Sequence, residues 1–193
     1  EMHYGMAKAG GEEAAIRSPV SREGMRMPHK PSTRLKVEAG EMVFADICGV
    51  FNRFHADLCR FFSLREPSNE VRERMEVLAR SLPWVIEAVK PGDPTMAIGE
   101  AIDKYVESAG LKGLVARGGY DLGISIPPDW VGHTRVASGG FVDVKMAPGF
   151  VTNYEVFSAD PKVPDLGFID TLLMTERGLE VLSKIPQEVL VAG

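Results

Sequence analysis

Most positions in residues 42–62, MVFADICGVFNRFHADLCRFF, suit a protein core, and the run is typical of β-strands. Two aspartates interrupt this pattern. Asp46 lies within VFADI and Asp57 lies within FHADLC, at positions where the pattern favours valine or leucine. Because an ionised carboxylate is costly to bury, the pair calls for a specific chemical role.

Two helices are predicted after this run. The first begins at Pro67-Ser68 and carries apolar residues at helical spacing, namely Val71, Met75, Leu78, Leu82, Ile86 and Val89. Pro83 lies within this pattern and predicts a kink or a break. The second helix begins at Asp93-Pro94, ends at Gly110 and carries the apolar residues Ile98, Ile102, Tyr105 and Val106.

The two ends of the chain have different patterns. Residues 1–9 are typical of a helix that ends at Gly10-Gly11. From Gly113 onward, short apolar runs are separated by glycine and proline, which predicts strands in the C-terminal third. No internal repeat or linker divides the chain, so we predict one α+β domain over residues 1–193.

Composition narrows the classes of function. The chain of 193 residues is 45% hydrophobic and 25% charged, which is typical of a globular domain. Its net charge of −5 and its lack of a basic cluster argue against nucleic acid or an anionic membrane as a partner. No apolar run approaches a membrane span, and Cys48 and Cys59 do not make a disulfide framework, so we expect a cytoplasmic protein.

The 42–62 run can fold back on itself as a hairpin. A loop at Phe51-Asn52 places Asp46 opposite Asp57 and Cys48 opposite His55. Facing carboxylates repel, and such a pair persists if a cation lies between them or if they share a proton. Phe-Asn is not a preferred two-residue turn, however, and a bulge or a longer loop that exposes one aspartate is the alternative.

The wider segment PHKPSTRLKVEAGEMVFADICGVFNRFHADLCRFFSLREPS resembles the metal-binding core of the Xaa-Pro peptidase, methionine aminopeptidase and creatinase superfamily. The resemblance continues through GGYDLGISIPPDW, APGFVTNYEVF and FIDTLLMTERGLEVLSKIPQEVL, and so covers nearly the whole chain. It implies the pita-bread α+β fold, a curved antiparallel sheet with flanking helices. It also implies that the first helices of the fold and an N-terminal domain are missing here.

The resemblance assigns roles to four residues. Asp46, Asp57 and Glu155 match three of the five usual metal ligands of the superfamily. His29, in PHKPS, matches a histidine that binds substrate in the peptidases and moves protons in creatinase. An imidazole that titrates near neutral pH suits proton transfer.

Three positions depart from the peptidase pattern. Tyr120 stands where the peptidases place a histidine ligand, Pro127 where they place a second histidine, and Ile169 where they place the last glutamate ligand. Isoleucine offers no lone pair and tyrosine is a poor ligand for divalent cations at neutral pH, so a dinuclear centre is not expected. GYDLGISIPPDW resembles the corresponding stretch of the ectoine hydrolase branch, which hydrolyses a C–N bond without that centre.

Other residues have two readings each. The Tyr120 hydroxyl donates a hydrogen bond to a substrate carbonyl, or the ring packs. His133 reaches the same cleft, or is a loop histidine without a role. Trp130 is a core residue or a wall for the substrate, and His55 is predicted to be structural.

Three functions therefore stay open. The first is hydrolysis of a C–N bond in a small amide, amidine or peptide, with His29 as general acid or base and Tyr120 and His133 as further catalytic candidates. The second is an Xaa-Pro metallopeptidase with a reduced metal centre, and the third is an inactive homologue. Either no cofactor is essential, or one divalent cation of the Mn, Co or Zn class binds weakly. We expect a small-molecule or short-peptide substrate and a homodimer of the full-length protein.

Overall fold

The structure is a computed structural model that describes residues 1–14, 20–21, 34–130, 132, 134 and 143–192. All statements below concern those residues. The predicted catalytic residues His29 and His133 lie outside them.

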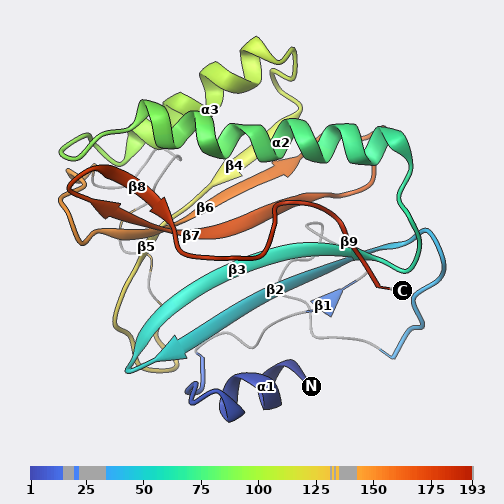
Figure 1. Cartoon of the computed structure of the whole chain (residues 1–193), viewed down its shortest axis with the longest axis horizontal. Coiled ribbons are helices and arrows are strands. Elements are labelled where there is room, and N and C mark those ends of the chain that lie inside the picture. Colours follow the sequence, from blue (N-terminus) through green and yellow to red (C-terminus); the bar gives the residue numbers. More distant parts are fainter. Residues whose placement is uncertain (15–19, 22–33, 131, 133, 135–142, 193) are drawn as a thin grey trace.

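The described strands form one curved sheet, with helices on both sides (Figure 1). The strand order is β1-β2-β3-β7-β6-β4, and the pairs along this path are antiparallel. The strands are β1 (Val20–Ser21), β2 (Met42–Phe51), β3 (Phe54–Ser63), β4 (Val115–Gly118), β5 (Asp121–Leu122), β6 (Val151–Ser158), β7 (Gly167–Thr175), β8 (Gly178–Val181) and β9 (Leu190–Val191). The predicted α+β fold, with a curved antiparallel sheet and flanking helices, is confirmed.

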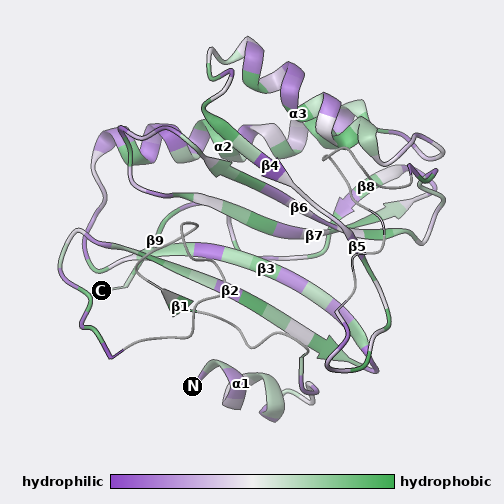
Figure 2. Cartoon of the chain, turned by 180° about the vertical axis from the view of Figure 1, so that it is seen from behind, coloured by the Kyte–Doolittle hydropathy of each residue, from purple (hydrophilic) through white to green (hydrophobic). Residues whose placement is uncertain are grey.

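Helices α2 (Asn69–Ala88) and α3 (Met96–Ser108) cover one face of the sheet, while α1 (Met2–Lys8) lies beyond β2 on the other side (Figure 1). Hydrophobic and hydrophilic stretches alternate along α2 (Figure 2). The apolar stripe of α2 is buried against the sheet through Val71, Met75, Leu78, Leu82 and Val85. Burial of this stripe, rather than helix propensity alone, stabilises α2.

Helix α2 continues through Pro83, so the predicted break at that residue is wrong. Proline cannot donate a backbone hydrogen bond to the carbonyl four residues earlier. Pro83 is exposed, and water can bind the carbonyl that it leaves without a donor. Helix α3 begins two residues later than predicted, with Thr95 as its N-cap. The Asp143 carboxylate accepts hydrogen bonds from Thr95 Oγ1 (2.9 Å) and Met96 N (3.2 Å) there.

The hairpin of β2 and β3 turns at Asn52-Arg53, one residue later than predicted. Both turn residues have positive φ angles, +48° and +67°, as in the two-residue turns that suit the twist of paired strands. Asp46 therefore lies opposite Cys59 and Cys48 lies opposite Asp57, so the predicted Asp46–Asp57 and Cys48–His55 pairs are wrong. The partner shift is two residues, and side chains alternate with a period of two, so both aspartates still share one face.

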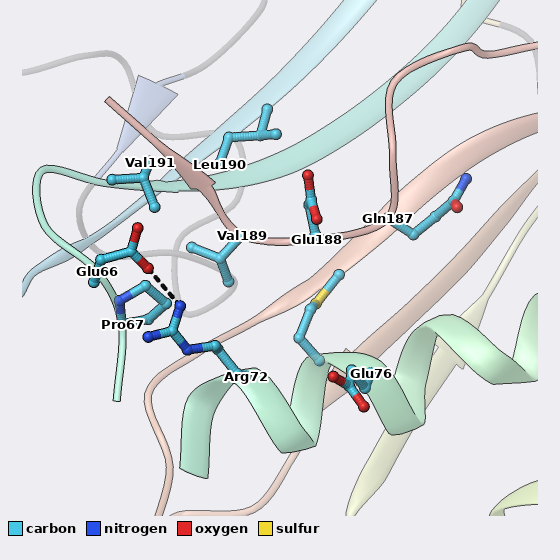
Figure 3. A pocket seen from close by; sticks show the side chains of 10 residues that line it. Glu66, Pro67, Arg72, Glu76, Gln187, Glu188, Val189, Leu190 and Val191 are labelled. Atoms are coloured by element: carbon cyan, nitrogen blue, oxygen red, sulfur yellow. Dashed lines mark hydrogen bonds and ion pairs between the residues drawn. The ribbon is translucent and has the colours of Figure 1, made fainter. Parts of the chain in front are cut away.

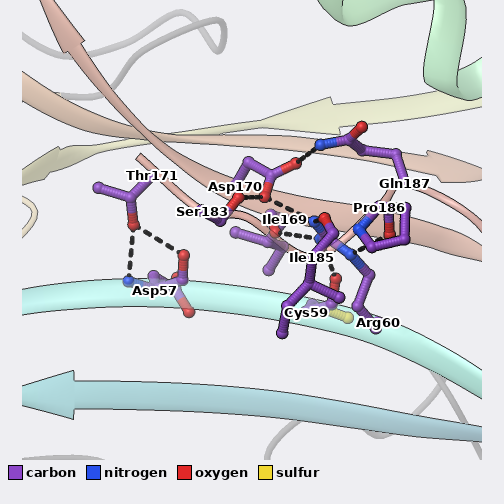
Figure 4. Close-up of polar contacts among 10 residues, drawn as sticks. All are labelled: Asp57, Cys59, Arg60, Ile169, Asp170, Thr171, Ser183, Ile185, Pro186 and Gln187. Carbon is purple, nitrogen blue, oxygen red and sulfur yellow. Dashed lines mark hydrogen bonds and ion pairs between the residues drawn. The ribbon is translucent and has the colours of Figure 1, made fainter. Parts of the chain in front are cut away.

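Arg60 joins three parts of the chain at the seam between β3 and β7 (Figure 4). All five N–H groups of its guanidinium have partners: four backbone carbonyls and Asp170 Oδ1 at 2.7 Å. The carbonyls belong to Cys59, Ile169, Ile185 and Pro186. Asp170 also accepts hydrogen bonds from Ser183 and Gln187. Because Arg60 is 1% exposed and Asp170 is 0% exposed, this ion pair is sheltered from water.

We expect Arg60→Leu to lower the free energy of unfolding by about 3–5 kcal/mol, because it leaves the Asp170 charge buried without its partner. Urea unfolding followed by circular dichroism measures the loss. The control is Arg80→Leu, which breaks the exposed Arg80–Glu76 pair on α2 and should change stability by less than about 0.5 kcal/mol. Equal effects of the two substitutions would contradict a special role for Arg60.

Candidate active site

Strand register brings the candidate residues into two adjacent rows on one face of the sheet. The first row crosses β2, β3, β7, β6 and β4 through Asp46, Cys59, Ile169, Glu155 and Gly118. The second row contains Cys48, Asp57, Thr171 and Asn153, each two residues further along its strand, and Tyr120, which lies just beyond the end of β4. Side chains two residues apart on a strand point to the same side, so the ten positions share one face.

This face is opposite the helix layer. Tyr154 points toward α2, where its hydroxyl is 2.5 Å from Ser81 Oγ. The neighbouring residues Asn153 and Glu155 therefore point to the other side of β6. The Asp57 backbone is fixed on this face by Thr171, whose hydroxyl accepts from Asp57 N (2.9 Å) and donates to Asp57 O (2.8 Å) (Figure 4).

Two neutral side chains donate hydrogen bonds to the Asp57 carboxylate. The Tyr120 hydroxyl donates to Oδ2 at 2.8 Å, and Asn153 Nδ2 donates to the same oxygen at 2.9 Å. Asn153 Nδ2 also donates to Glu155 Oε1 at 2.7 Å, while Asn153 Oδ1 accepts from Tyr120 N at 2.6 Å. Asn153 on β6 thus connects Asp57 on β3 with Glu155 on its own strand, and it also holds the backbone of Tyr120 between β4 and β5.

Sequence reasoning missed Asn153, although a usable signal was present. Asn153 lies two residues before Glu155 on a strand, which places both side chains on the same face. The two readings of Tyr120 were also incomplete. Its hydroxyl hydrogen-bonds to a carboxylate of the site, and burial, followed by the charges of Asp57 and Glu155, raises the pKa of the phenol.

Gly118 makes room for the Glu155 carboxylate. A Cβ atom at Gly118 would lie 2.5 Å from Glu155 Oε2, closer than carbon and oxygen atoms approach without bonding. Since Gly118 and Glu155 are direct partners in the β4–β6 register, a larger residue at position 118 would displace Glu155 from the row. Glycine at 118 is therefore part of the site, and only the register identifies it.

Asp46 has the most perturbed carboxyl group of the site. It is 6% exposed, and its Oδ1 atom is buried without a hydrogen-bond partner. Burial, followed by the negative charge of Asp57, raises the pKa of Asp46 to about 8. In the absence of a cation, Asp46 is therefore protonated at neutral pH, which lowers the repulsion between the two aspartates.

His55 and Trp130 lie beside these rows. His55 precedes Asp57 by two residues on β3, so its side chain points to the same face, and it is fully buried. Its Nδ1 atom is 3.0 Å from the Arg53 carbonyl, and its Nε2 atom is buried without a partner. The Trp130 ring packs edge-on against His55, with centroids 5.1 Å apart, and lies 6.3 Å from the Tyr120 ring.

The dinuclear centre that the resemblance implies does not fit these residues. Ile169 supplies no donor atom to the first row, and the Tyr120 hydroxyl occupies a lone pair of Asp57 that a second cation would need. The donor atoms of Asp46, Cys48 and Asp57, in contrast, all lie within 4.8 Å of one another. Asp46 also carries the unpartnered Oδ1 atom, so the described residues fit one cation at most.

A separate cavity of about 520 Å³ lies between the start of α2 and residues 187–191 (Figure 3). Arg72 pairs with Glu66 at its rim, and Met75 contributes to its wall. None of the residues that line it belongs to the two rows. This cavity is therefore distinct from the candidate active site.

Comparison with known proteins agrees with this architecture. The chain aligns over 98% of its length with the X-Pro aminopeptidase of Thermotoga maritima, with a TM-score of 0.79 and 20% identity, and covers 52% of that chain. The prolidase of Pyrococcus furiosus aligns over 94% of this chain and 53% of its own, with a TM-score of 0.78 and 22% identity. At these identities the likeness establishes the fold, which is that of the pita-bread enzymes.

The sequence comparison identifies the family. Residues 1–176 match metallopeptidase family M24, and the chain belongs to this family. It is 32% identical to the ectoine hydrolase of Halomonas elongata over 170 residues, which are 85% of this chain and 41% of that protein. It is 24% identical to the Xaa-Pro dipeptidase of Pyrococcus furiosus over 193 residues, or 53% of that enzyme. The chain thus spans about half the length of these relatives.

The sequence pattern resembled both the Xaa-Pro peptidase superfamily and its ectoine hydrolase branch. The two relatives found belong to these groups, so the resemblance is confirmed. None of the described helices combines the length and the apolarity that a membrane span requires.

We expect the Asp46→Asn variant to gain stability over the parent as pH rises, when both are measured in chelator. The folded pKa of Asp46 is about 8, against 3.8 for an unperturbed aspartate. Between these values the folded chain holds one more proton than the unfolded chain, so the free energy of unfolding of the parent falls as pH rises through this window. Asparagine does not titrate. The difference between variant and parent should grow by up to about 4 kcal/mol from pH 5 to pH 8.

Urea unfolding at pH 5, 6, 7 and 8 measures this difference. A constant offset between Asp46→Asn and the parent at all four pH values would exclude a proton on Asp46 in the folded chain.

We expect the double variant Tyr120→His/Ile169→Glu to bind Mn²⁺ or Co²⁺ more tightly than the parent. The two changes add an imidazole and a carboxylate to rows that already hold Asp46, Asp57 and Glu155, and transition metals favour this set. Tyr120→Phe/Ile169→Gln is the matched control, because it removes the same side chains without adding an imidazole or a charge. Calorimetric titration with each metal makes the comparison, and equal affinities in all three proteins would mean that neither position faces the site.

Proposed function

We propose that this chain is part of a hydrolase that cleaves a C–N bond in a small amide, amidine or peptide, at a site with at most one divalent cation. The hydrogen bonds on Asp57 carry this proposal. Tyr120 and Asn153 provide neutral donors where a dinuclear enzyme needs metal ions, so the carboxylates are stabilised without them. The 32% identity to an ectoine hydrolase supports a small molecule, rather than a peptide, as the substrate.

The residues of the site have distinct roles in this proposal. Asp57 and Glu155, held in place by Asn153, orient the substrate and the attacking water through hydrogen bonds. The Tyr120 and Trp130 rings form an apolar wall that limits access of further water. A cation, when bound, would supply polarisation of the group under attack.

Hydrolysis requires that water adds to the carbon, that the C–N bond breaks and that the departing nitrogen gains a proton. We assign the proton transfer to His29, as the superfamily resemblance suggests, with His133 as a further candidate. Because both histidines lie outside the described residues, these roles stay predictions. The homodimer and the cytoplasmic location stay predictions as well.

An Xaa-Pro dipeptidase with a reduced metal centre is the second candidate. The retention of Asp46, Asp57 and Glu155 together on one face favours it, since these three carboxylates are ligands in the peptidases that the sequence resembles. The two functions differ in substrate. An inactive homologue would hydrolyse neither substrate class.

The test uses purified full-length protein whose metal content is measured by elemental analysis. Cyclic amidines, guanidino acids and N-acyl amino acids are compared with Xaa-Pro dipeptides, each with chelator, Zn²⁺ or Mn²⁺. We expect turnover of a compact amide or amidine with no more than one metal ion per chain, and little cleavage of the dipeptides.

In the same assay, His29→Ala should lower the rate by about 10²–10⁴ if His29 transfers the proton, while the neighbouring Lys30→Ala should retain most of it. Preferential cleavage of Xaa-Pro dipeptides would overturn the proposal in favour of the peptidase, and cleavage of neither substrate class would overturn it in favour of an inactive homologue.

A further inference from the structure

Three different donor groups meet where β2 and β3 approach each other in the site. The Asp46 and Asp57 carboxylates and the Cys48 thiol place one donor atom each within 4.8 Å of the other two. All three residues are buried, with exposed fractions of 6%, 2% and 3% for Asp46, Asp57 and Cys48. Cys48 lies directly opposite Asp57, and Asp46 precedes Cys48 by two residues on the same strand face.

A second observation points to a ligand at this place. Asp46 Oδ1 is buried and accepts no hydrogen bond, whereas nearly all buried polar atoms in proteins have a partner. The thiol opposite is a weak donor, with Cys48 Sγ 3.9 Å from Asp57 Oδ1. Among the described residues, Asp46 Oδ1 is therefore an acceptor without a donor, next to a second carboxylate and a sulfur atom.

We propose that Asp46, Cys48 and Asp57 bind one thiophilic divalent cation of the zinc class, with the Cys48 thiolate as a ligand. The superfamily resemblance assigns Asp46 and Asp57 as ligands but gives Cys48 no role, so the cysteine changes the kind of metal that the site selects. This inference concerns binding alone and does not rest on the reaction proposed above.

The donor set determines the preference among cations. Carboxylates alone suit Mg²⁺, Ca²⁺ and Mn²⁺, whereas a thiolate favours Zn²⁺ and other softer ions. Coordination requires the thiol to lose its proton to solvent. Three protein ligands leave one tetrahedral position of the cation for water or substrate, as in catalytic zinc sites.

A cavity gives a route to Cys48 from the side of the sheet that α1 occupies. It has a volume of about 450 Å³, and Cys48 forms part of its wall together with residues of α1 and the segment that follows it. Glu12, Glu13 and His3 also line this cavity. Glu12 is paired with Arg53 at 2.7 Å, so Glu13 supplies the carboxylate of the wall that is open to a cation on its way to the thiol.

The other buried thiol provides a matched control. Cys59 is fully buried and lies directly opposite Asp46 on the same face, but its sulfur is not part of the group of mutually close donor atoms. Replacing either cysteine with serine removes one sulfur from nearly the same surroundings and changes the side-chain volume little. The two variants therefore separate ligation by Cys48 from a general effect of a lost thiol.

The experiment uses the full chain, freed of metal with a chelator and then titrated with Co²⁺ alone as a spectroscopic substitute for Zn²⁺. We expect one Co²⁺ per chain, with a near-ultraviolet charge-transfer band from thiolate to metal. The band should disappear in Cys48→Ser and persist in Cys59→Ser. Competition calorimetry should give Cys48→Ser a Zn²⁺ affinity lower by about tenfold or more, with little change for Mn²⁺.

X-ray absorption of the Zn²⁺-loaded parent provides a test that needs no variant, because a thiolate ligand appears as a sulfur neighbour at about 2.3 Å. Absence of sulfur from the zinc shell, a charge-transfer band that survives in Cys48→Ser, or equal affinity of the parent for Mn²⁺ and Zn²⁺ would each overturn the proposal.

Discussion

The site depends on the seam between β3 and β7, where the two halves of the sheet meet. Among the described residues, Cys59 and Ile169 are the one pair in register across this seam, so regular strand pairing provides little to hold it. Hydrogen bonds from side chains hold β3 and β7 together where backbone hydrogen bonds between the strands are few. The Thr171 hydroxyl binds both backbone groups of Asp57, and Arg60 binds the carbonyls of Cys59 and Ile169 from the opposite face. The relative position of Asp57 and Glu155 follows from these contacts.

The substitutions in the site change its charge as well as its ligands. The peptidase pattern that the sequence resembles implies four carboxylates at a dinuclear centre, so that four negative charges would meet four positive charges. In the pattern that the sequence resembles, Ile169 stands at the position of one of these carboxylates, and burial beside Asp57 favours the protonated form of Asp46 when no cation is present. Two negative charges then remain, and the Tyr120 hydroxyl and the Asn153 amide stabilise them through hydrogen bonds. The two neutral donors are therefore compatible with a site that lacks two ligands of the pattern that the sequence resembles.

The sequence predicted the elements better than their exact junctions. The apolar stripe of α2 and the strand pattern of residues 42–62 identified elements correctly, because burial selects residue type at periodic positions. The predicted turn of the hairpin was misplaced by one residue. Both residues of the observed turn, Asn52 and Arg53, have positive φ angles, and arginine has little preference for such a conformation, so the sequence did not indicate this turn. The start of α3 depends on Asp143, which is distant in sequence, and no local signal reveals such a cap.

Within the site, the alternation of side chains along a strand explains why the predicted proximity of the two aspartates was correct despite the wrong register. Asp46 and Asp57 stay on one face under any register shift of two residues, so their proximity followed from the strand pattern although their pairing did not. The same alternation extends to Cys48, His55 and Asn153, which join the site because they alternate with buried core residues on the same strands. Their residue types did not indicate a role in the site, because a cysteine or a histidine within an apolar strand is usually interpreted as a core residue. In a curved sheet of this kind, the complete site is therefore found by following one face through every strand, whatever chemistry each residue type suggests alone.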